Sequence, residues 1–392
     1  MYIKRKLSEK LSALAKGFPA IALLGPRQSG KTTLAKNVFP EYEYYSFEDL
    51  DIRILAANDP RAFLEKCQTA KGVILDEIQN VPTLFSYLQT NIDLNKKMGH
   101  FILTGSQNFA LTESISQSLA GRIAILTLLP LSIAEIKEAR LLPDNIDNAI
   151  FNGMYPAIYS NNVSPLDWYK SYINTYVERD VRQIKNITDL SAFQSFLKLC
   201  AGRVGQVLSL TTLSNDSGLS ITTVKQWLSI LEASYIIFLF RPFYKNLNKR
   251  VIKSSKLFFY DTGILCNLLS IVKTEQLFSH YLKGNIFESF IISDLVKQRY
   301  NKGLDPNLYF WRDQSDFEVD CIVEEAEKII AVEIKSSQTH NPHVFDYLAK
   351  WNKIANTDLA SNILIYTGSL QINTKDGKLI NWKDAGNLLE HL

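Results

Sequence analysis

Short apolar runs alternate with helical patterns over the first third of the chain. Four of these runs read as strands, at residues 18–24, 72–75, 101–103 and 122–128. Between them lie segments with apolar residues at helical spacing, for example 60–67 and 82–92. Buried strands that alternate with helices predict a parallel sheet whose two faces are covered by helices. We therefore expect an α/β fold for this part of the protein.

The pattern changes further along the chain. Residues 131–190 read as helices interrupted by loops, and residues 191–270 as three helices followed by a two-stranded ribbon. From about residue 282 the order reads helix, strand, strand, helix, strand. The chain thus predicts more than one unit, as its length of 392 residues allows.

Composition narrows the class of protein. Hydrophobic residues make up 46% and charged residues 21%, which is ordinary for a soluble globular protein, and a net charge of +3 does not by itself indicate nucleic acid. The four cysteines form no CxxC pair, so we expect neither a disulfide framework nor a zinc site, and a reducing, cytoplasmic compartment. We also expect no signal peptide and no membrane span.

One loop carries a phosphate-binding signature. Residues 25–32 fit the pattern GxxxxGK[ST] and lie between an apolar strand and a helical segment. Glycines let the backbone wrap a phosphate with its N–H groups at a helix N-terminus. Lys31 is expected to reach the β- and γ-phosphates of ATP, and the Thr32 hydroxyl to bind Mg²⁺. The predicted nucleotide-binding residues are Gly25, Pro26, Arg27, Gln28, Ser29, Gly30, Lys31, Thr32 and Thr33.

The next strands end in polar side chains. Asp76 and Glu77 follow the strand at 72–75, and a parallel strand delivers its carboxyl end to the ligand crevice. We expect Asp76 to hold Mg²⁺ through water and Glu77 to polarise the attacking water. Ser106 and Asn108 follow the third strand and are expected to orient that water or to sense the γ-phosphate.

The middle of the chain predicts a winged helix. Two helical segments at 208–219 and 220–231 are joined by a turn that contains Gly218, and two apolar segments after them would form the wing. The loop between these strands holds five cations and no acid: Lys245, Lys249, Arg250, Lys253 and Lys256. Such a loop suits contacts with DNA phosphates, but winged helices also serve as packing modules. Both interpretations stay open.

The last part of the chain carries a second set of charged residues. Asp320 lies on a predicted strand, and Glu333 and Lys335 lie two residues apart on one face of another. With Glu288 on an upstream helix, they form the PD-(D/E)xK nuclease pattern. Asp320 and Glu333, assisted by Glu288, would bind Mg²⁺, and Lys335 would position water or stabilise the developing charge. An amphipathic hairpin with solvated charges, or a fold kept without cutting activity, is the alternative.

Several motifs together resemble one family. GPRQSGKT at 25–32, VILDEIQNVP at 73–82, ILTGSQN at 102–108 and LAGR at 119–122 are similar to the bacterial and archaeal AAA+/STAND-like P-loop ATPases. GMYP at 153–156 and YVERD at 176–180 resemble the middle region of the same family. The resemblance implies ATP, Mg²⁺, Walker A and Walker B motifs, a winged helix and a restriction-endonuclease-like domain. It also implies an arginine near the γ-phosphate, often from a neighbouring subunit, for which Arg122 and then Arg179 are the candidates.

These observations predict four units and one main function. The units are a P-loop ATPase domain at 1–130, a helical lid at 131–190, a winged helix at 191–270 and a nuclease-like domain at 275–392. We expect Mg²⁺-dependent ATP hydrolysis and action on DNA, with the basic wing at 245–256 as a DNA contact and a homo-oligomer as a compatible assembly. The alternative is a nucleotide-driven switch or scaffold whose last two domains only bind partners.

Overall fold

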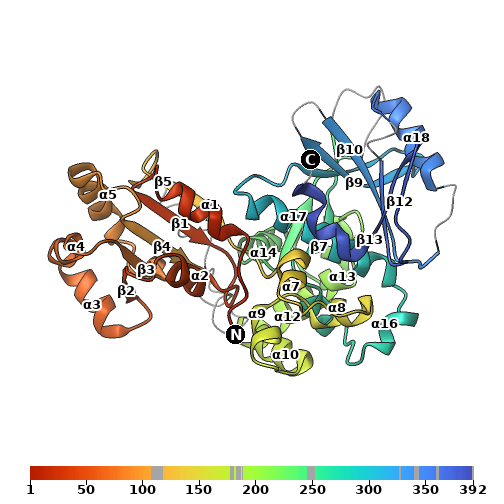
Figure 1. Ribbon diagram of the computed structural model, residues 1–392. Helices are drawn as coiled ribbons and strands as arrows, with labels where there is room; N and C mark the ends of the chain where they lie inside the picture. Colours follow the sequence, from red (N-terminus) through yellow and green to blue (C-terminus); the bar gives the residue numbers. More distant parts are fainter. Residues whose placement is uncertain are drawn as a thin grey trace.

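The structure is a computed structural model. It describes residues 1–106, 118–176, 181, 187, 189–244, 252–325, 328–339, 344–358 and 362–390. The chain from α1 to β5 forms one lobe, and the elements from α7 onward pack into a second, larger lobe (Figure 1). Of the helices in these ranges, none combines the length and the apolar character needed to cross a membrane.

The first lobe is built on a parallel five-stranded sheet, which confirms the predicted fold class. The strand order is β2-β3-β4-β1-β5, and every neighbouring pair is parallel. The short edge strand β2 was not predicted, because its sequence is polar and half of it is exposed. The strands are β1 (Ala20–Leu24), β2 (Glu43–Ser46), β3 (Val73–Asp76), β4 (Phe101–Gly105) and β5 (Ile123–Thr127).

Helices cover both faces of this sheet, as the alternating pattern predicts. Ile21 and Leu23 of β1 pack with α1 and α2, whereas Ala20 and Ala22 face the opposite core with α4 and α5. Successive residues of a strand point to opposite faces, so β1 supplies both cores at once. The helices are α1 (Leu7–Leu14), α2 (Lys31–Val38), α3 (Leu50–Asn58), α4 (Pro60–Gln68) and α5 (Leu84–Asn95), with a short 3₁₀ turn η1 (Ile78–Asn80).

The second lobe begins with helices. Four of them are α7 (Ile133–Glu138), α8 (Ile146–Asn152), α9 (Pro156–Ser160) and α10 (Pro165–Tyr176). Then come α12 (Leu190–Ala201), α13 (Leu210–Ser217), α14 (Ile221–Ala233) and the antiparallel ribbon of β6 (Ile237–Phe240) and β7 (Lys256–Phe259). Three helices followed by a ribbon is the order of elements that the sequence predicts. Two short helices, α15 (Thr262–Leu268) and α16 (Glu275–Ser279), follow the ribbon.

The chain ends in a mixed six-stranded sheet, which has more strands than the pattern predicts. The order is β12-β13-β11-β10-β9-β8, and the long helix α17 (Lys283–Asn301) precedes it. The remaining elements are β8 (Leu308–Arg312), β9 (Glu318–Glu325), β10 (Lys328–Lys335), α18 (Val344–Ala355), β11 (Ile363–Tyr366), β12 (Ile372–Thr374), β13 (Gly377–Asn381) and the 3₁₀ segment η4 (Trp382–Glu390).

The middle helices and the C-terminal sheet share one hydrophobic core. A single cluster of buried residues runs from α7 through α12, α14 and the ribbon to α17 and the C-terminal strands. The ribbon also joins the outer edge of the sheet, because the backbone N–H of Phe243 donates to the Phe310 carbonyl oxygen at 2.7 Å. The predicted wing is therefore packed against the last part of the chain at this point.

Candidate nucleotide site and carboxylate cluster

The phosphate-binding loop connects β1 to α2. Gly25 and Gly30 have φ angles of +145° and +94°, and a side chain at Gly25 would come within 2.1 Å of the Leu128 carbonyl oxygen. Only glycine fits that first position. The ammonium of the buried Lys31 donates to the carbonyl oxygens of Gly25 and Pro26, at 3.0 and 2.8 Å. Lys31 thus lies over the loop that would surround a phosphate.

Asp76 and Thr32 meet at the carboxyl end of the sheet, as predicted. Asp76 Oδ1 accepts hydrogen bonds from the Thr32 hydroxyl at 2.8 Å and from the Thr104 hydroxyl. Its other oxygen, Oδ2, accepts from the Tyr44 hydroxyl at 2.8 Å. Burial, with a smaller contribution from Asp76, raises the pKa of Tyr44 to about 12, so this hydroxyl stays a donor. A hydroxyl and a carboxylate in contact beside a phosphate loop fit Mg²⁺.

Glu77 follows Asp76 directly and accepts hydrogen bonds from two neighbouring side chains. Its Oε2 accepts from the Ser106 hydroxyl at 2.7 Å and from the Gln79 amide. Burial alone would raise the pKa of Glu77, but the charge of Lys31 and these two hydrogen bonds outweigh it and hold the pKa below its ordinary value. The carboxylate is therefore ionised at neutral pH, as a group that orients an attacking water requires.

Arg5 anchors the loop, and sequence reasoning missed it. Its buried guanidinium donates to the Ser29 carbonyl oxygen at 2.7 Å, to the Leu129 carbonyl oxygen at 2.7 Å and to Glu135 Oε1 at 3.0 Å. Glu135 also forms a capping box with Ser132 at the start of α7. Arg5 thus ties the phosphate loop to the first helix of the second lobe. No motif marks this arginine in the sequence.

Of three further predicted residues, the structure describes only Arg122, and it lies away from this chain's own nucleotide site. Arg122 pairs with Asp93 at the surface, with N–O distances of 2.6 and 2.9 Å. It directly precedes β5, whose first residue pairs with Ala20 at the amino end of β1, whereas the phosphate loop follows the carboxyl end. Arg122 therefore lies at the amino end of the parallel strands, opposite the end that carries the phosphate loop. A role in a neighbouring subunit stays a prediction. Asn108 and Arg179 lie outside the described residues.

The second set of predicted residues comes together between α17, β9 and β10. The Lys335 ammonium pairs with Glu333 and lies 3.5 Å from Asp320 Oδ2. Glu288, Glu318 and Asp320 each offer one oxygen, and these oxygens lie within 4.8 Å of one another. Glu318 was not predicted, although its position two residues before Asp320 places both on one face of β9. We call Glu288, Glu318, Asp320 and Glu333 the carboxylate cluster.

Within the described part of the chain, one oxygen of the carboxylate cluster accepts no hydrogen bond. Glu333 is nine-tenths buried, and its Oε2 makes no hydrogen bond with any residue that the structure describes. Burial raises the pKa of Glu333 and that of Glu288 to about 8, and the charge of Asp320 adds to the effect while Lys335 and Lys256 oppose it. A buried carboxylate oxygen without a donor, next to further acids, fits a site for a hard cation such as Mg²⁺.

Lys256 departs from its predicted place. It was expected in a basic wing that contacts phosphate, yet it is only 2% exposed. Its ammonium donates to Glu288 Oε1 at 2.9 Å and pairs with Glu318. Burial would lower the pKa of Lys256, but the two carboxylates raise it above its ordinary value. Lys253 is exposed, whereas Lys245, Lys249 and Arg250 lie outside the described residues.

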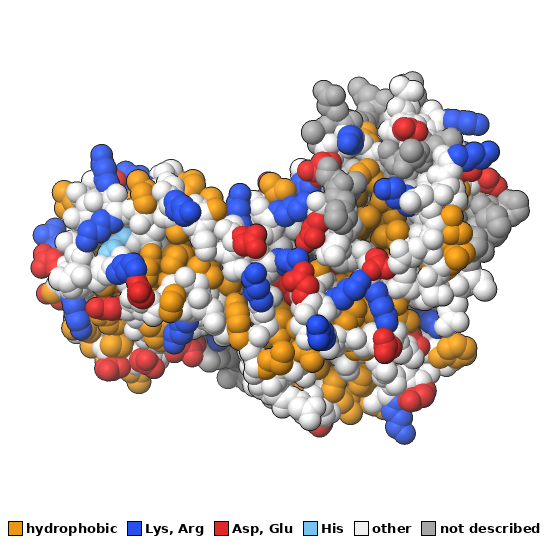
Figure 2. Space-filling view, in the orientation of Figure 1, with side chains coloured by type: hydrophobic (Ala, Val, Ile, Leu, Met, Phe, Trp, Pro, Cys, Tyr) orange, Lys and Arg blue, Asp and Glu red, His pale blue; other side chains and the backbone are white. Residues whose placement is uncertain are grey.

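Charges of both signs are mixed on the molecular surface. Among the described residues on the face shown in Figure 2, lysine and arginine side chains are scattered among acidic ones and form no extended single-sign surface. The lysine and arginine side chains seen there thus do not form a continuous basic surface of the kind that binds nucleic acid.

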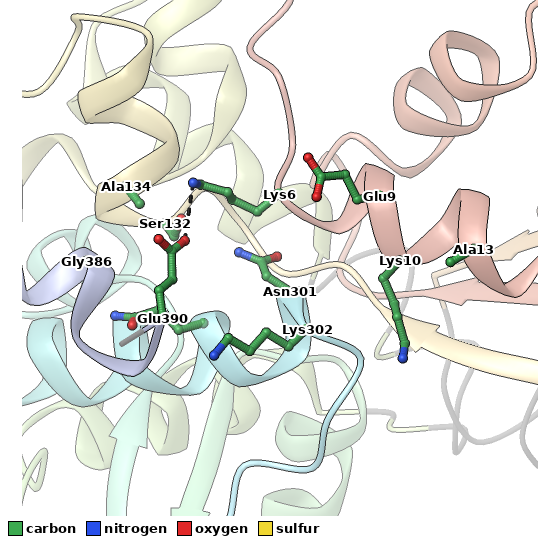
Figure 3. A pocket seen from close by; sticks show the side chains of 11 residues that line it. Lys6, Glu9, Lys10, Ala13, Ser132, Ala134, Asn301, Lys302, Gly386 and Glu390 are labelled. Atoms are coloured by element: carbon green, nitrogen blue, oxygen red, sulfur yellow. Dashed lines mark ion pairs between the residues drawn. The ribbon is translucent and has the colours of Figure 1, made fainter. Parts of the chain in front are cut away.

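A separate cavity of about 430 Å³ lies where α1 meets α7, α17 and η4 (Figure 3). Lys6 reaches across it to Glu390 at 3.2 Å. None of the predicted site residues lines this cavity. It marks the junction through which the first lobe contacts the end of the chain.

Comparison with known proteins divides the chain into three matched regions. Residues 17–137 match an AAA domain, residues 143–275 a domain of unknown function (DUF8612), and residues 283–384 another domain of unknown function (DUF4143). Uncharacterized proteins of Mycobacterium bovis and Mycobacterium tuberculosis are each 29% identical over 343 residues, which covers 86% of this chain and 74% of theirs.

Two solved structures also match parts of the chain. A Walker-type ATPase of Pyrococcus abyssi is 14% identical, covering 68% of this chain and 96% of that one, with a TM-score of 0.46. The RuvB Holliday junction branch migration motor of Thermotoga maritima is 18% identical, covering 59% of this chain and 88% of that one, with a TM-score of 0.31. Residues 17–137, which match the AAA domain model, include the phosphate loop and the contact between Asp76 and Thr32.

Proposed function

We propose that this protein hydrolyses ATP with Mg²⁺ at the phosphate loop and acts on DNA through the carboxylate cluster. The observation that carries the first half is the arrangement at one sheet edge, where Asp76 contacts Thr32 and the ionised Glu77 is aimed by Ser106. These are the groups that a P-loop enzyme needs to hold a metal ion and to orient water.

The proposed ATPase mechanism uses groups already in position. Thr32 and Asp76 would hold Mg²⁺, which neutralises charge on the phosphates when it is bound. Lys31 exchanges the carbonyl oxygens of Gly25 and Pro26 for the β- and γ-phosphates. Glu77 accepts a hydrogen bond from the water and orients it for in-line attack on the γ-phosphate, because its depressed pKa keeps it ionised.

The carboxylate cluster supports the DNA-acting half. Glu288, Asp320 and Glu333 would hold Mg²⁺. The observation that favours this is the buried Oε2 of Glu333, which makes no hydrogen bond with the described part of the chain. Lys335 beside them would position a water or stabilise charge on the phosphate. In this proposal residues 131–190 are a lid, 191–270 a winged helix and 275–392 a nuclease-like domain, and copies of the chain assemble into a homo-oligomer.

A second candidate is a nucleotide-driven switch whose nuclease-like domain only binds partners. The observation that favours it is Lys256, whose ammonium already contacts two of the acids, Glu288 and Glu318. When the Lys256 ammonium pairs with these acids, a metal ion is not required to balance their charge.

Supercoiled plasmid DNA with Mg²⁺, with and without ATP, tests both candidates. Nicking and phosphate release are measured for wild type, Glu77→Gln and Asp320→Ala, with Glu65→Gln and Asp316→Ala as exposed controls. We expect Glu77→Gln to lower phosphate release by about 10²- to 10⁴-fold and Asp320→Ala to abolish nicking alone. Unchanged phosphate release in Glu77→Gln would contradict the ATPase mechanism. Absence of nicking by wild type would favour the switch.

A further inference from the structure

We propose that Lys256 is an internal cation that occupies the carboxylate cluster when no metal ion is bound and competes with a divalent cation for the same oxygens. The inference rests on the proposed metal-binding role of that cluster and adds a residue that limits access to it.

The contacts of Lys256 place its charge on Glu288, which belongs to the proposed metal-binding set, and on Glu318 beside it. Its ammonium lies 2.9 Å from Glu288 Oε1 and pairs with Glu318, and these acids are two of the three whose oxygens lie within 4.8 Å of one another. Two cations side by side in a buried site repel each other strongly. A divalent cation on this set of oxygens therefore requires Lys256 to move away.

Lys256 comes from the ribbon rather than from the C-terminal sheet. It is the first residue of β7 and pairs with Phe240 of β6, while Glu288 and Glu318 lie 32 and 62 residues further along the chain. Lys256 and the acids therefore stand on different elements, so a movement of the Lys256 side chain does not require the backbone that carries the acids to move. The position of the ribbon thus controls whether the Lys256 ammonium pairs with the acids of the cluster.

The turn that contains Gly205 also lies close to Glu288. The N–H of Gly205 donates to the Leu257 carbonyl oxygen at 2.8 Å, which fixes the turn after α12 against β7. Gly205 has a φ of +70°, and a side chain there would come within 2.7 Å of the Asn285 amide and 3.3 Å of Glu288 Oε2. The turn and the ribbon therefore form one wall of the cluster, and Lys256 projects from that wall.

Binding of Mn²⁺ to the nucleotide-free full-length chain, measured by titration calorimetry, tests the proposal. The variants are wild type, Lys256→Met, Lys256→Arg and the control Lys253→Met, which removes the same charge from an exposed site three residues away. Each is also made with Asp320→Asn, so that binding at the cluster is separated from any binding at the phosphate loop. Circular dichroism checks that each variant is folded.

We expect Lys256→Met to raise the Asp320-dependent Mn²⁺ affinity by about tenfold or more, because a competing charge is removed. Lys256→Arg and Lys253→Met should keep the wild-type affinity. The melting temperature of Lys256→Met should be lower without metal and should rise more on addition of Mn²⁺ than that of wild type. If Lys256→Met is too unstable to purify, Lys256→Gln removes the charge but keeps a donor, and the same gain in affinity is expected.

Two results would overturn the proposal, and they differ in whether they also reject the metal-binding role of the cluster. Equal or weaker Asp320-dependent binding in folded Lys256→Met, with clear binding by wild type, would reject competition and leave the metal-binding role standing. No Asp320-dependent binding in any variant would reject both, and Lys256 would then be only a structural ion-pair partner.

Discussion

The phosphate loop and the carboxylate cluster each combine a buried lysine with acids, but the lysines are held in different ways. Lys31 donates to two backbone carbonyl oxygens, whereas Lys256 donates to two carboxylates. A carbonyl oxygen is a neutral acceptor, so an ammonium can exchange it for a phosphate and gain charge attraction. A carboxylate is already a full counter-charge. The difference teaches that Lys31 is poised to bind a ligand, whereas Lys256 takes the place of one.

The two sites also differ in how the chain assembles them. The nucleotide site uses the ends of neighbouring parallel strands, β1, β3 and β4, together with the edge strand β2. The carboxylate cluster needs β7, α17, β9 and β10 from two regions that share one core. A displacement of the ribbon would therefore change the second site and leave the first intact.

Lys31→Ala tests the comparison with the largest expected effect. ATP binding should weaken on the order of 100-fold or more, because a buried charge that contacts the phosphates is lost. Removal of this lysine should thus lower the affinity for its ligand, whereas Lys256→Met should raise the affinity for Mn²⁺. Calorimetric titration with ATP measures it, and a thermal melt checks that the variant is folded. Unchanged ATP affinity would contradict the assignment of the phosphate loop.

Arg5→Met tests whether the phosphate loop depends on the second lobe for its position. We expect the free energy of unfolding to fall by about 3 kcal/mol or more, since the change leaves Glu135 buried without its ion-pair partner. ATP affinity should fall as well, because the Ser29 carbonyl oxygen loses its donor. Urea unfolding followed by circular dichroism measures the first effect.

Lys6→Met is the matched control for Arg5→Met. Lys6 is the next residue and forms more exposed ion pairs with Glu138 and Glu390, so its loss should cost less than about 1 kcal/mol. Equal effects of the two changes would show that the buried contacts of Arg5 have no special weight.

Arg122→Ala should have the smallest effect on this chain's own site. Its ion pair with Asp93 is at the surface and lies at the sheet edge opposite the phosphate loop. ATP turnover at low protein concentration should therefore equal that of wild type. If a neighbouring subunit uses Arg122, a loss of turnover appears only as protein concentration rises. A uniform loss at every concentration would contradict the position of Arg122 described above.

Much of the first lobe was predictable because its signals are local. The strands β1, β3, β4 and β5 are apolar runs, and residues close to them in sequence carry the site. The edge strand β2 was not predicted because its sequence is polar. For the same reason the hydrogen bond from Tyr44 on this strand to Asp76 was not predicted. The C-terminal sheet was predicted only in part, since the exposed strand β12 has no apolar pattern to mark it.

The sequence by itself determined the residue sets of the two sites: the phosphate loop with Asp76 and Glu77, and Asp320 with Glu333 and Lys335. The phosphate loop, the pair Asp76 and Glu77, and the pair Glu333 and Lys335 are each marked by spacing within a few residues, where backbone geometry decides which side chains share a face or a turn. Only the tertiary structure decided the partners of Arg5 and Lys256. A basic side chain has the same local sequence signal whether it is solvated or buried in an ion pair. Its partner depends on strand order and on which lobes pack together, and neither is encoded in local spacing.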